Sequence, residues 1–249
     1  MAAKSNPIPS VWARPQREPE QPALNRDAIV REAIAVLDAD GVEALSMRKL
    51  GARLNAGATS LYRHVATKDE LIELALDEVF GEIPVPDPGA SDWRADITAT
   101  CQAFRATTLR HRWLGSVIGQ AGLVYLGPNL VAISERMAAL FSAVGFPEPS
   151  RAIETVLSYV LGMSTSEAAF LTTVMRSGRT EAEFIAGLMP SAQEAVAGHE
   201  FLAEAFADAA ADAAAAADPA TLRNAKFDYG LDVILDGLAL RLPGRQGDS

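Results

Sequence analysis

One stretch of the chain, residues 44–68, carries five positive side chains and no acidic one. The five are Arg48, Lys49, Arg53, Arg63 and Lys68. Proteins that neutralise the phosphates of nucleic acid gather cations in this way. The whole chain has a net charge of −10, and because the stretch contributes +5, the other residues sum to −15. The stretch is therefore the candidate nucleic-acid surface, although a solvated basic face would carry the same charges.

The same stretch has the pattern of two short helices joined by a tight turn. Ser46 can cap the first helix, and residues 55–57 (Asn-Ala-Gly) can make the turn, because Asn and Gly tolerate a left-handed backbone best. In the second helix Leu61 and Val65 face inward. Its outward side chains are Thr59, Ser60, Tyr62, Arg63 and His64. A helix-turn-helix places its second helix in the major groove, so pattern and charge together favour DNA binding.

Helical periodicity extends over most of the chain. Asn25 and Gly41 are predicted to cap a helix between them, and residues 67–70 form a capping box that opens another. Apolar residues recur at helical spacing in 150–175 and 227–238, and no alternating strand of convincing length is found. The sequence therefore predicts an all-α fold.

Breaks in this pattern indicate the domain organisation. Residues 1–24, with five prolines, are predicted to be a flexible arm. A proline-rich boundary at 81–89 separates a DNA-binding domain, 25–80, from a larger domain, 88–243. A third irregular zone is expected from about 176 to 219. Within it, residues 203–217 contain 11 alanines in 15 positions, which predicts a weakly packed helix.

Several classes of protein are excluded or disfavoured. The single cysteine, Cys101, can form neither an intramolecular disulfide nor a cysteine-based zinc site. No secretory signal or membrane-spanning run is present, so a soluble cytoplasmic protein is expected. No HExxH, GxSxG or nucleotide-binding loop occurs, so no catalytic residues, metal site or cofactor are expected. His111, between Arg110 and Arg112, is interpreted as a solvated helix end.

Residues 24–80 resemble the tetracycline-repressor (TetR) family of transcriptional regulators. The residues that carry the resemblance are Gly41 to Leu50 (GVEALSMRKL), Ser60 to Val65 (SLYRHV) and Lys68 to Leu71 (KDEL). Asn55 stands where the family usually has a turn glycine, and Gly57 where a capping Ser is common. Both residues suit their positions, so neither departure breaks the motif.

The resemblance implies roles for individual residues. Thr59, Ser60, Tyr62 and Arg63 would form the recognition surface, with Tyr62 and His64 near phosphates. Arg48 would reach a base or the backbone, and Lys68 would clamp a phosphate. No role is assigned to the arm.

The larger domain resembles the tetracycline-repressor-type ligand-binding and dimerisation domain, mainly over 227–238. Helices at about 150–175 and 227–238, with Gly230 and Gly237 on one face, are expected to pair with those of a second copy as a four-helix bundle, although ordinary intrachain packing gives the same pattern. The candidate ligand-lining residues are Phe104, Thr108, Trp113, Val117, Tyr125, Met137, Met163 and Phe170.

The function implied is a ligand-responsive regulator, most often a repressor. It would bind a palindromic double-stranded DNA operator as a homodimer and be released by a small-molecule effector, with no membrane involved. Two alternatives stay open: a constitutive DNA-binding regulator without an effector, and a helical small-molecule-binding module that has lost DNA binding.

Overall fold

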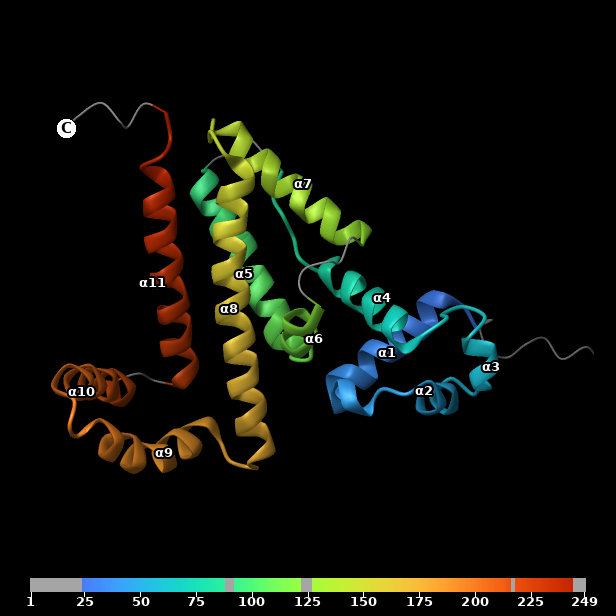
Figure 1. Cartoon of the computed structure of the whole chain (residues 1–249), viewed down its shortest axis with the longest axis horizontal. Helices are drawn as coiled ribbons and strands as arrows, with labels where there is room; N and C mark the ends of the chain where they lie inside the picture. The colour runs from blue at the N-terminus through green and yellow to red at the C-terminus, as the bar shows by residue number, and fades with distance from the viewer. Residues whose placement is uncertain (1–23, 88–91, 122–126, 216–217, 244–249) are drawn as a thin grey trace, which may run out of the picture.

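The computed structural model describes residues 24–87, 92–121, 127–215 and 218–243. Within these ranges it contains eleven α-helices, one short 3₁₀ helix and no strand, so the predicted all-α fold is confirmed. Figure 1 shows helices α1–α4 at one end of the molecule, which we call the head, and helices α5–α11, which we call the body. Apart from Leu24, the predicted arm lies outside the described residues.

The head is built around helix α1. Its elements are α1 (Arg26–Asp40), the 3₁₀ helix η2 (Val42–Ala44), α2 (Met47–Arg53), α3 (Ala58–Leu61) and α4 (Lys68–Phe80). The predicted ends of α1 are confirmed. Asn25 Oδ1 accepts the N–H of Ala28 at 2.8 Å. Gly41, with φ of 79°, donates its N–H to the carbonyl of Leu37 at 2.9 Å.

The capping box predicted at the start of α4 is only half formed. Thr67 Oγ1 accepts the N–H of Glu70 at 3.0 Å, as such a box requires. The Glu70 carboxylate, however, accepts the N–H of Ala66 at 2.6 Å, one residue before the expected donor. Both bonds satisfy polar groups at the helix start, so α4 is still anchored directly after the turn that follows α3.

The body continues the hydrophobic core of the head. Its first helices and its last are α5 (Trp93–Arg110), α6 (Leu114–Ala121), α7 (Pro128–Ala143), α8 (Pro149–Arg176) and α11 (Pro219–Ala239). One cluster of buried side chains runs from Leu61 in the head through Phe80 of α4 to Phe104 and Phe141 in the body. Each such side chain contributes roughly 1.5–3 kcal/mol of transfer free energy when fully buried.

An aspartate of α4 fixes the start of α7. Asp77 Oδ1 accepts the backbone N–H groups of Asn129, at 3.1 Å, and of Leu130, at 3.2 Å. These N–H groups lie at a helix N-terminus, where they have no carbonyl within their own helix. The head helix α4 is therefore tied to the body by polar bonds as well as by the core.

The prediction of an irregular zone from 176 to 219 is wrong for most of its length. The segment folds as α9 (Glu181–Val196) and α10 (Glu200–Ala215), and Thr180 and Glu183 form a complete capping box at the start of α9. The alanine-rich residues up to Ala215 are helical, as predicted, and residues 216–217 lie outside the description. No residue in the stretch 200–211 of α10 is buried, which agrees with the weak packing predicted for the alanine-rich helix.

A partly buried ion-pair network holds four body helices together. Arg105 of α5 makes two bonds of 2.7 Å to the Glu167 carboxylate of α8, and Arg223 of α11 donates to the same carboxylate at 2.8 Å. Arg223 also pairs with Glu181 of α9. Burial alone would raise the pKa of Glu167, but the two guanidinium groups outweigh burial and lower it. In the part of the chain described, no helix is long and apolar enough to cross a membrane.

Candidate nucleic-acid interface and ligand site

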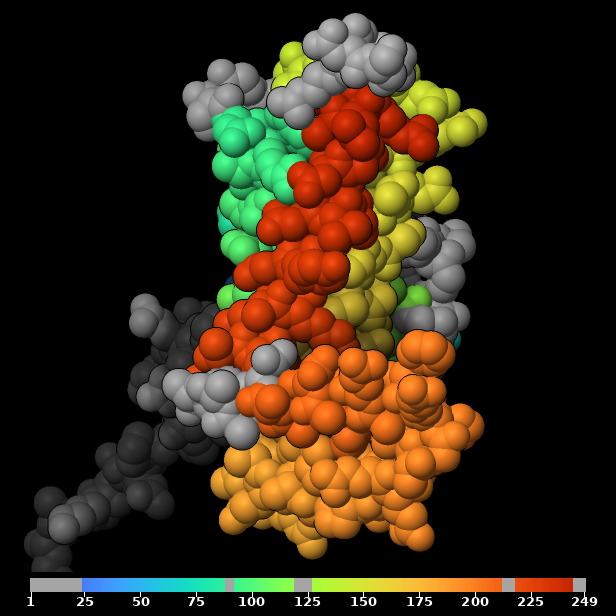
Figure 2. Space-filling view, turned by 90° about the vertical axis from the view of Figure 1, so that its left-hand side faces the viewer, coloured from blue at the N-terminus to red at the C-terminus, as the bar shows by residue number. Residues whose placement is uncertain are grey.

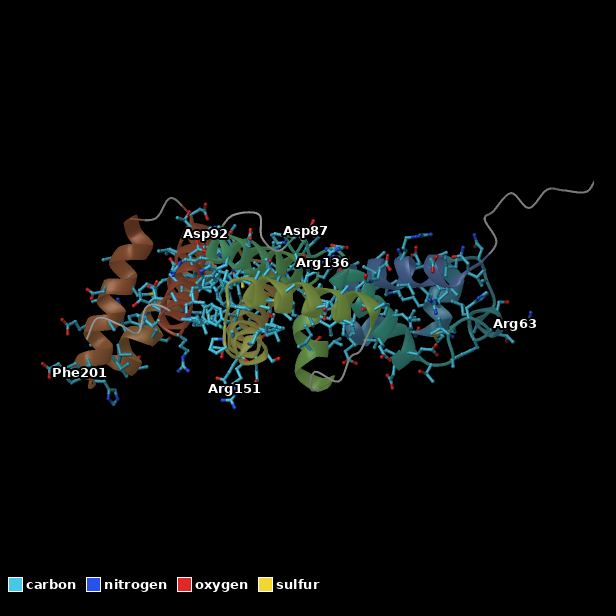
Figure 3. All side chains as sticks on the ribbon, turned by 90° about the horizontal axis from the view of Figure 1, so that it is seen from above. Arg63, Asp87, Asp92, Arg136, Arg151 and Phe201 are labelled. Carbon is cyan, nitrogen blue, oxygen red and sulfur yellow. The ribbon has the colours of Figure 1, made fainter. Side chains whose placement is uncertain are left out.

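The outward side chains predicted for the second helix of the motif are all exposed. They are Thr59, Ser60, Tyr62, Arg63 and His64. Leu61 and Val65 are buried beneath them, as expected. Helix α3 itself is short, but N–H bonds from His64 and Val65 to the carbonyl of Leu61 continue the turn. Figure 3 shows Arg63 at the tip of the head, at the opposite end of the molecule from Phe201.

The turn between α2 and α3 has the backbone that its residues predict. Asn55 has φ of 50°, in the left-handed region that Asn tolerates. Gly51 of α2 packs directly against the turn and α3, since a β-carbon there would stand 2.6 Å from the carbonyl oxygen of Ala56 and 3.0 Å from Cδ1 of Leu61. Gly51 therefore lets α3 pack against α2, and the exposed face of α3 is held at a fixed angle.

Two of the five cations are paired within the head. Lys49 Nζ lies 2.7 Å from Asp40 Oδ2, and this contact lowers the pKa of Asp40. Arg53 pairs with Glu32 of α1. Both pairs fasten α2 to α1, so these cations serve the fold of the head.

The other three cations are Arg48, Arg63 and Lys68. Among the described residues, Arg48 and Arg63 make no ion pair, and both are exposed. Lys68 is half-buried, and its amine donates to the carbonyl of Val42 at 3.0 Å. One of its three N–H donors is therefore engaged in the head, and its role as a phosphate clamp stays a prediction.

The predicted ligand-lining residues lie mostly in the core of the body. Phe104, Thr108, Trp113, Val117 and Met137 are buried, and Met163 and Phe170 are partly buried. The Phe170 ring packs against Phe184 of α9, with 6.0 Å between the centroids. Tyr125 lies outside the described residues. One further polar group is buried there: the hydroxyl of Ser164 on α8 has no hydrogen-bond acceptor or donor among the described residues.

The interpretation of His111 as a solvated helix end is wrong. The side chain is buried, with 5 % of the residue exposed. Its Nδ1 lies 2.7 Å from Oδ1 of Asp38 in α1, and its Nε2 lies 3.3 Å from Glu82, just after α4. The indole N–H of Trp113 donates to the same Asp38 oxygen at 2.8 Å. Sequence carries no signal for this cluster, because Asp38 precedes His111 by 73 residues.

A cleft of about 780 Å³ lies beside this cluster, between the head and the body. It is lined by residues 37–43 of the head, by residues of the α5–α6 corner and by one side of α8. Of the predicted ligand-lining residues, only Trp113 is among them.

The outer face of α11 exposes an apolar stripe. Tyr229, Val233 and Leu240 are exposed by 75, 54 and 68 %, and Figure 2 shows α11 at the surface between α5 and α8. Gly237, on this helix, has open space around the position of a β-carbon among the described residues. Gly230, by contrast, packs tightly on Tyr159 of its own α8. The close helix approach expected at Gly230 is therefore an intrachain contact.

Comparison with known proteins identifies the architecture. The profile of bacterial regulatory proteins, tetR family, matches residues 29–75, and that of the tetracyclin repressor-like C-terminal domain matches 85–242. An HTH-type transcriptional regulator of Saccharopolyspora erythraea is 42% identical over 164 residues, which are 65% of this chain and 69% of that protein. The HTH-type transcriptional repressor DrrR1 of Streptomyces coeruleorubidus is 33% identical over 95% of this chain and 84% of its own length.

The same relationship holds for solved structures. The Streptomyces coelicolor TetR family protein ActR, in complex with actinorhodin, superposes with a TM-score of 0.72 at 27% identity, over 90% of this chain and 99% of ActR. The C-terminal profile alone spans more than half of the chain, and the similarity to DrrR1 runs over nearly all of it. The resemblance found in the sequence is confirmed, and the chain belongs to the TetR family of transcriptional regulators.

Proposed function

We propose that the chain is a ligand-responsive repressor that binds a palindromic DNA operator as a homodimer and is released by a small-molecule effector. The observation that carries this proposal is the exposed polar and basic face of α3, held rigidly by the buried Leu61 and the close contact at Gly51. A fixed helix with uncommitted hydrogen-bonding side chains is what reading the major groove requires.

Individual roles follow from position. Arg63, at the tip of the head, is assigned to a base edge. Thr59 and Ser60, which are also exposed, are assigned to the same recognition surface. Tyr62 and His64 are assigned to phosphates, Arg48 to a base or the backbone, and Lys68 to a phosphate. Arginine paired with guanine carries roughly 1–3 kcal/mol of base discrimination, whereas phosphate contacts set overall affinity.

The homodimer is proposed to form through α8 and α11. An exposed stripe with a tyrosine, a valine and a leucine on one helix is costly in water and gains free energy when a second copy covers it. A two-fold dimer also matches the operator, since it would place two recognition helices about 34–36 Å apart.

An effector site in the body is supported by the relative ActR, which was solved with actinorhodin bound. The residues proposed to line it are those named from the sequence, with Ser164 as an added polar group. We propose that the chain has the two domains predicted from its sequence: residues 25–80 bind DNA, and residues 88–243 bind the ligand and form the dimer. We also propose that the chain is not an enzyme and acts in the cytoplasm, in keeping with a family of regulators.

The experiment is selection of bound DNA from a random double-stranded pool by the full-length protein. A palindromic motif with two half-sites about one helical turn apart is expected. A chain that enriches no DNA, while remaining folded, would contradict the proposal and favour the small-molecule module that has lost DNA binding.

A further inference from the structure

The cleft between head and body has both apolar and cationic walls. The tryptophan ring of Trp113, Leu37, Leu109 and the thioether of Met175 give the apolar lining. Its volume of about 780 Å³ is within the range that holds small organic ligands. Figure 1 locates its walls at the end of α1, at α6 and along the lower half of α8.

Most of the acids that line the cleft are already paired. Asp38 accepts from both His111 and Trp113, and Asp40 is paired with Lys49. Glu43 is the lining acid for which the described residues provide no ion pair. Asp38 and Asp40 are therefore held by partners of their own, and among the described residues neither makes an ion pair with an arginine on the other wall.

Two arginines on the body side are left with their charges uncompensated. Arg112 and Arg176 both line the cleft, and neither makes an ion pair with any described residue. Among the described residues, the guanidinium of Arg112 has the sulfur of Met175 as its hydrogen-bond acceptor, at 3.9 Å. Arg110, the third lining arginine, is paired with Glu82. Two guanidinium groups that line the same cleft as an aromatic ring suit an oxyanion on an apolar body, because guanidinium pairs with carboxylate and phosphate in a bidentate manner.

We propose that this cleft is a second ligand site, for a small amphiphilic organic anion that carries a carboxylate, sulfonate or phosphate group. Its oxyanion would be held by Arg112 and Arg176, and its apolar part would lie against Trp113. The site is separate from the one in the body core, because of the residues proposed there only Trp113 lines the cleft.

Occupancy of this site would be sensed by DNA binding, an inference that rests on the proposed function. The cleft is lined by residues 37–43 of the head and by residues of α6 and α8 in the body. A ligand that contacts both walls binds more tightly at one head orientation than at another. Such a difference in affinity is the condition for a ligand to shift a conformational equilibrium.

The test uses the fluorescent aromatic sulfonate anilinonaphthalene sulfonate (ANS) as the probe of the full-length protein. Replacing both arginines (Arg112→Ala with Arg176→Ala) is expected to weaken the tightest ANS binding about tenfold or more, since each removes a charge-assisted bond. The charge-preserving double variant (Arg112→Lys with Arg176→Lys) is expected to bind ANS more tightly than the alanine double variant. Arg151→Ala, an exposed arginine at the other end of α8, is the matched control and should change nothing.

Two further measurements make the outcome decisive. Ala169→Trp places a large ring on the α8 wall, so it should reduce ANS binding without removing charge. The uncharged analogue phenylnaphthylamine should be insensitive to both arginine changes. Each variant is checked by circular dichroism for the helical signal of the parent. If the affinity for ANS is unchanged both in the alanine double variant and in Ala169→Trp, the proposal of a ligand site in this cleft is wrong.

The coupling is tested separately by operator affinity with and without saturating ANS. A change of about threefold or more, absent in the arginine double variant, is expected if the cleft sets the head orientation. Equal operator affinities with and without ANS would show that the cleft is not coupled to DNA binding. The existence of the ligand site would then still be decided by the ANS titration. Absence of operator binding by the ligand-free protein would count against the proposed function and not against the cleft.

Discussion

His111 Nδ1 lies 2.7 Å from Asp38 Oδ1, and this bond joins the body to the last turn of the first head helix. The same imidazole reaches Glu82 with its other nitrogen, and Trp113 donates to the same aspartate. Two side chains of the α5–α6 corner, His111 and Trp113, thus meet at the Asp38 carboxylate of the head, and Glu82 contacts the far side of the imidazole. The cluster adjoins the cleft, and it is a polar contact between the body and α1.

Replacing His111 with alanine should weaken this contact between the head and the body. The variant removes a buried side chain and the imidazole partner of Asp38, so the free energy of unfolding is expected to fall by about 1–3 kcal/mol. Urea unfolding followed by circular dichroism measures the change. His199→Ala, which removes an exposed histidine between α9 and α10, is the control and should be neutral. Equal stabilities of the two variants would show that the His111 contacts contribute nothing.

Arg63 and Lys68 are expected to differ in what they control. Arg63→Ala should relax base preference at one position of each half-site, with a loss of roughly 1–3 kcal/mol on the preferred sequence. Lys68→Ala should weaken all sequences alike. Selection of DNA from a random pool by each variant distinguishes the two. An unchanged sequence preference for Arg63→Ala would reject its assignment to a base.

Glu167→Gln should destabilise the body at neutral pH. The carboxylate accepts from two arginines, and removing its charge leaves both cations without full compensation, at a cost of about 2–4 kcal/mol. Glu154→Gln, at an exposed position of the same helix, is the control.

The pH dependence of this effect has a definite sign. The pKa of Glu167 is lowered in the folded state, so its stabilisation is fully present above the ordinary carboxyl value of 4.5 and is lost as pH falls through the folded pKa. The difference between parent and Glu167→Gln in urea unfolding should therefore shrink below that pH. A difference that grows on acidification would contradict this account of the network.

Val233→Asp should separate the dimer. A charge at the centre of the apolar stripe of α11 would be buried against the second copy without a counter-ion. Sedimentation is expected to give a dimer for the parent and a monomer for the variant at the same concentration, with operator affinity lowered about 100-fold or more because one half-site is lost. Leu188→Asp changes an equally exposed leucine on α9 and should leave the dimer intact. If Leu188→Asp separates the dimer and Val233→Asp does not, the interface lies at α9 and not at α11.

Local signals explain what the sequence could predict. The caps at Asn25 and Ser46 and the left-handed turn at Asn55 depend on residues within three or four positions, and all three occur. The exposed face of α3 follows from the spacing of Leu61 and Val65. The irregular zone is wrong over α9, whose interior holds Gly187 and Pro190, residue types that disfavour a helix, whereas its alanine-rich part is helical as predicted.

Contacts between distant segments escaped prediction for a physical reason. Asp38 and His111 are 73 residues apart, and Arg105 and Glu167 are 62 apart, so nothing in their local sequence distinguishes them from solvated charges. The same holds for the head–body cleft, whose walls come from three separate segments. Gly230 was read as a surface position for a second copy, but the tight contact with Tyr159 depends on how α8 and α11 cross.

The central claim is that the exposed head face binds DNA through its basic side chains. It is tested most directly by the operator affinity of the full-length protein as a function of salt. If each head of a dimer places Arg48 and Lys68 on phosphates, the logarithm of affinity should fall with the logarithm of salt with a slope of about −4, and the Arg48→Ala variant should reduce that slope to about −2. Affinity that does not depend on salt, or a slope unchanged by Arg48→Ala and Lys68→Ala together, would contradict the account.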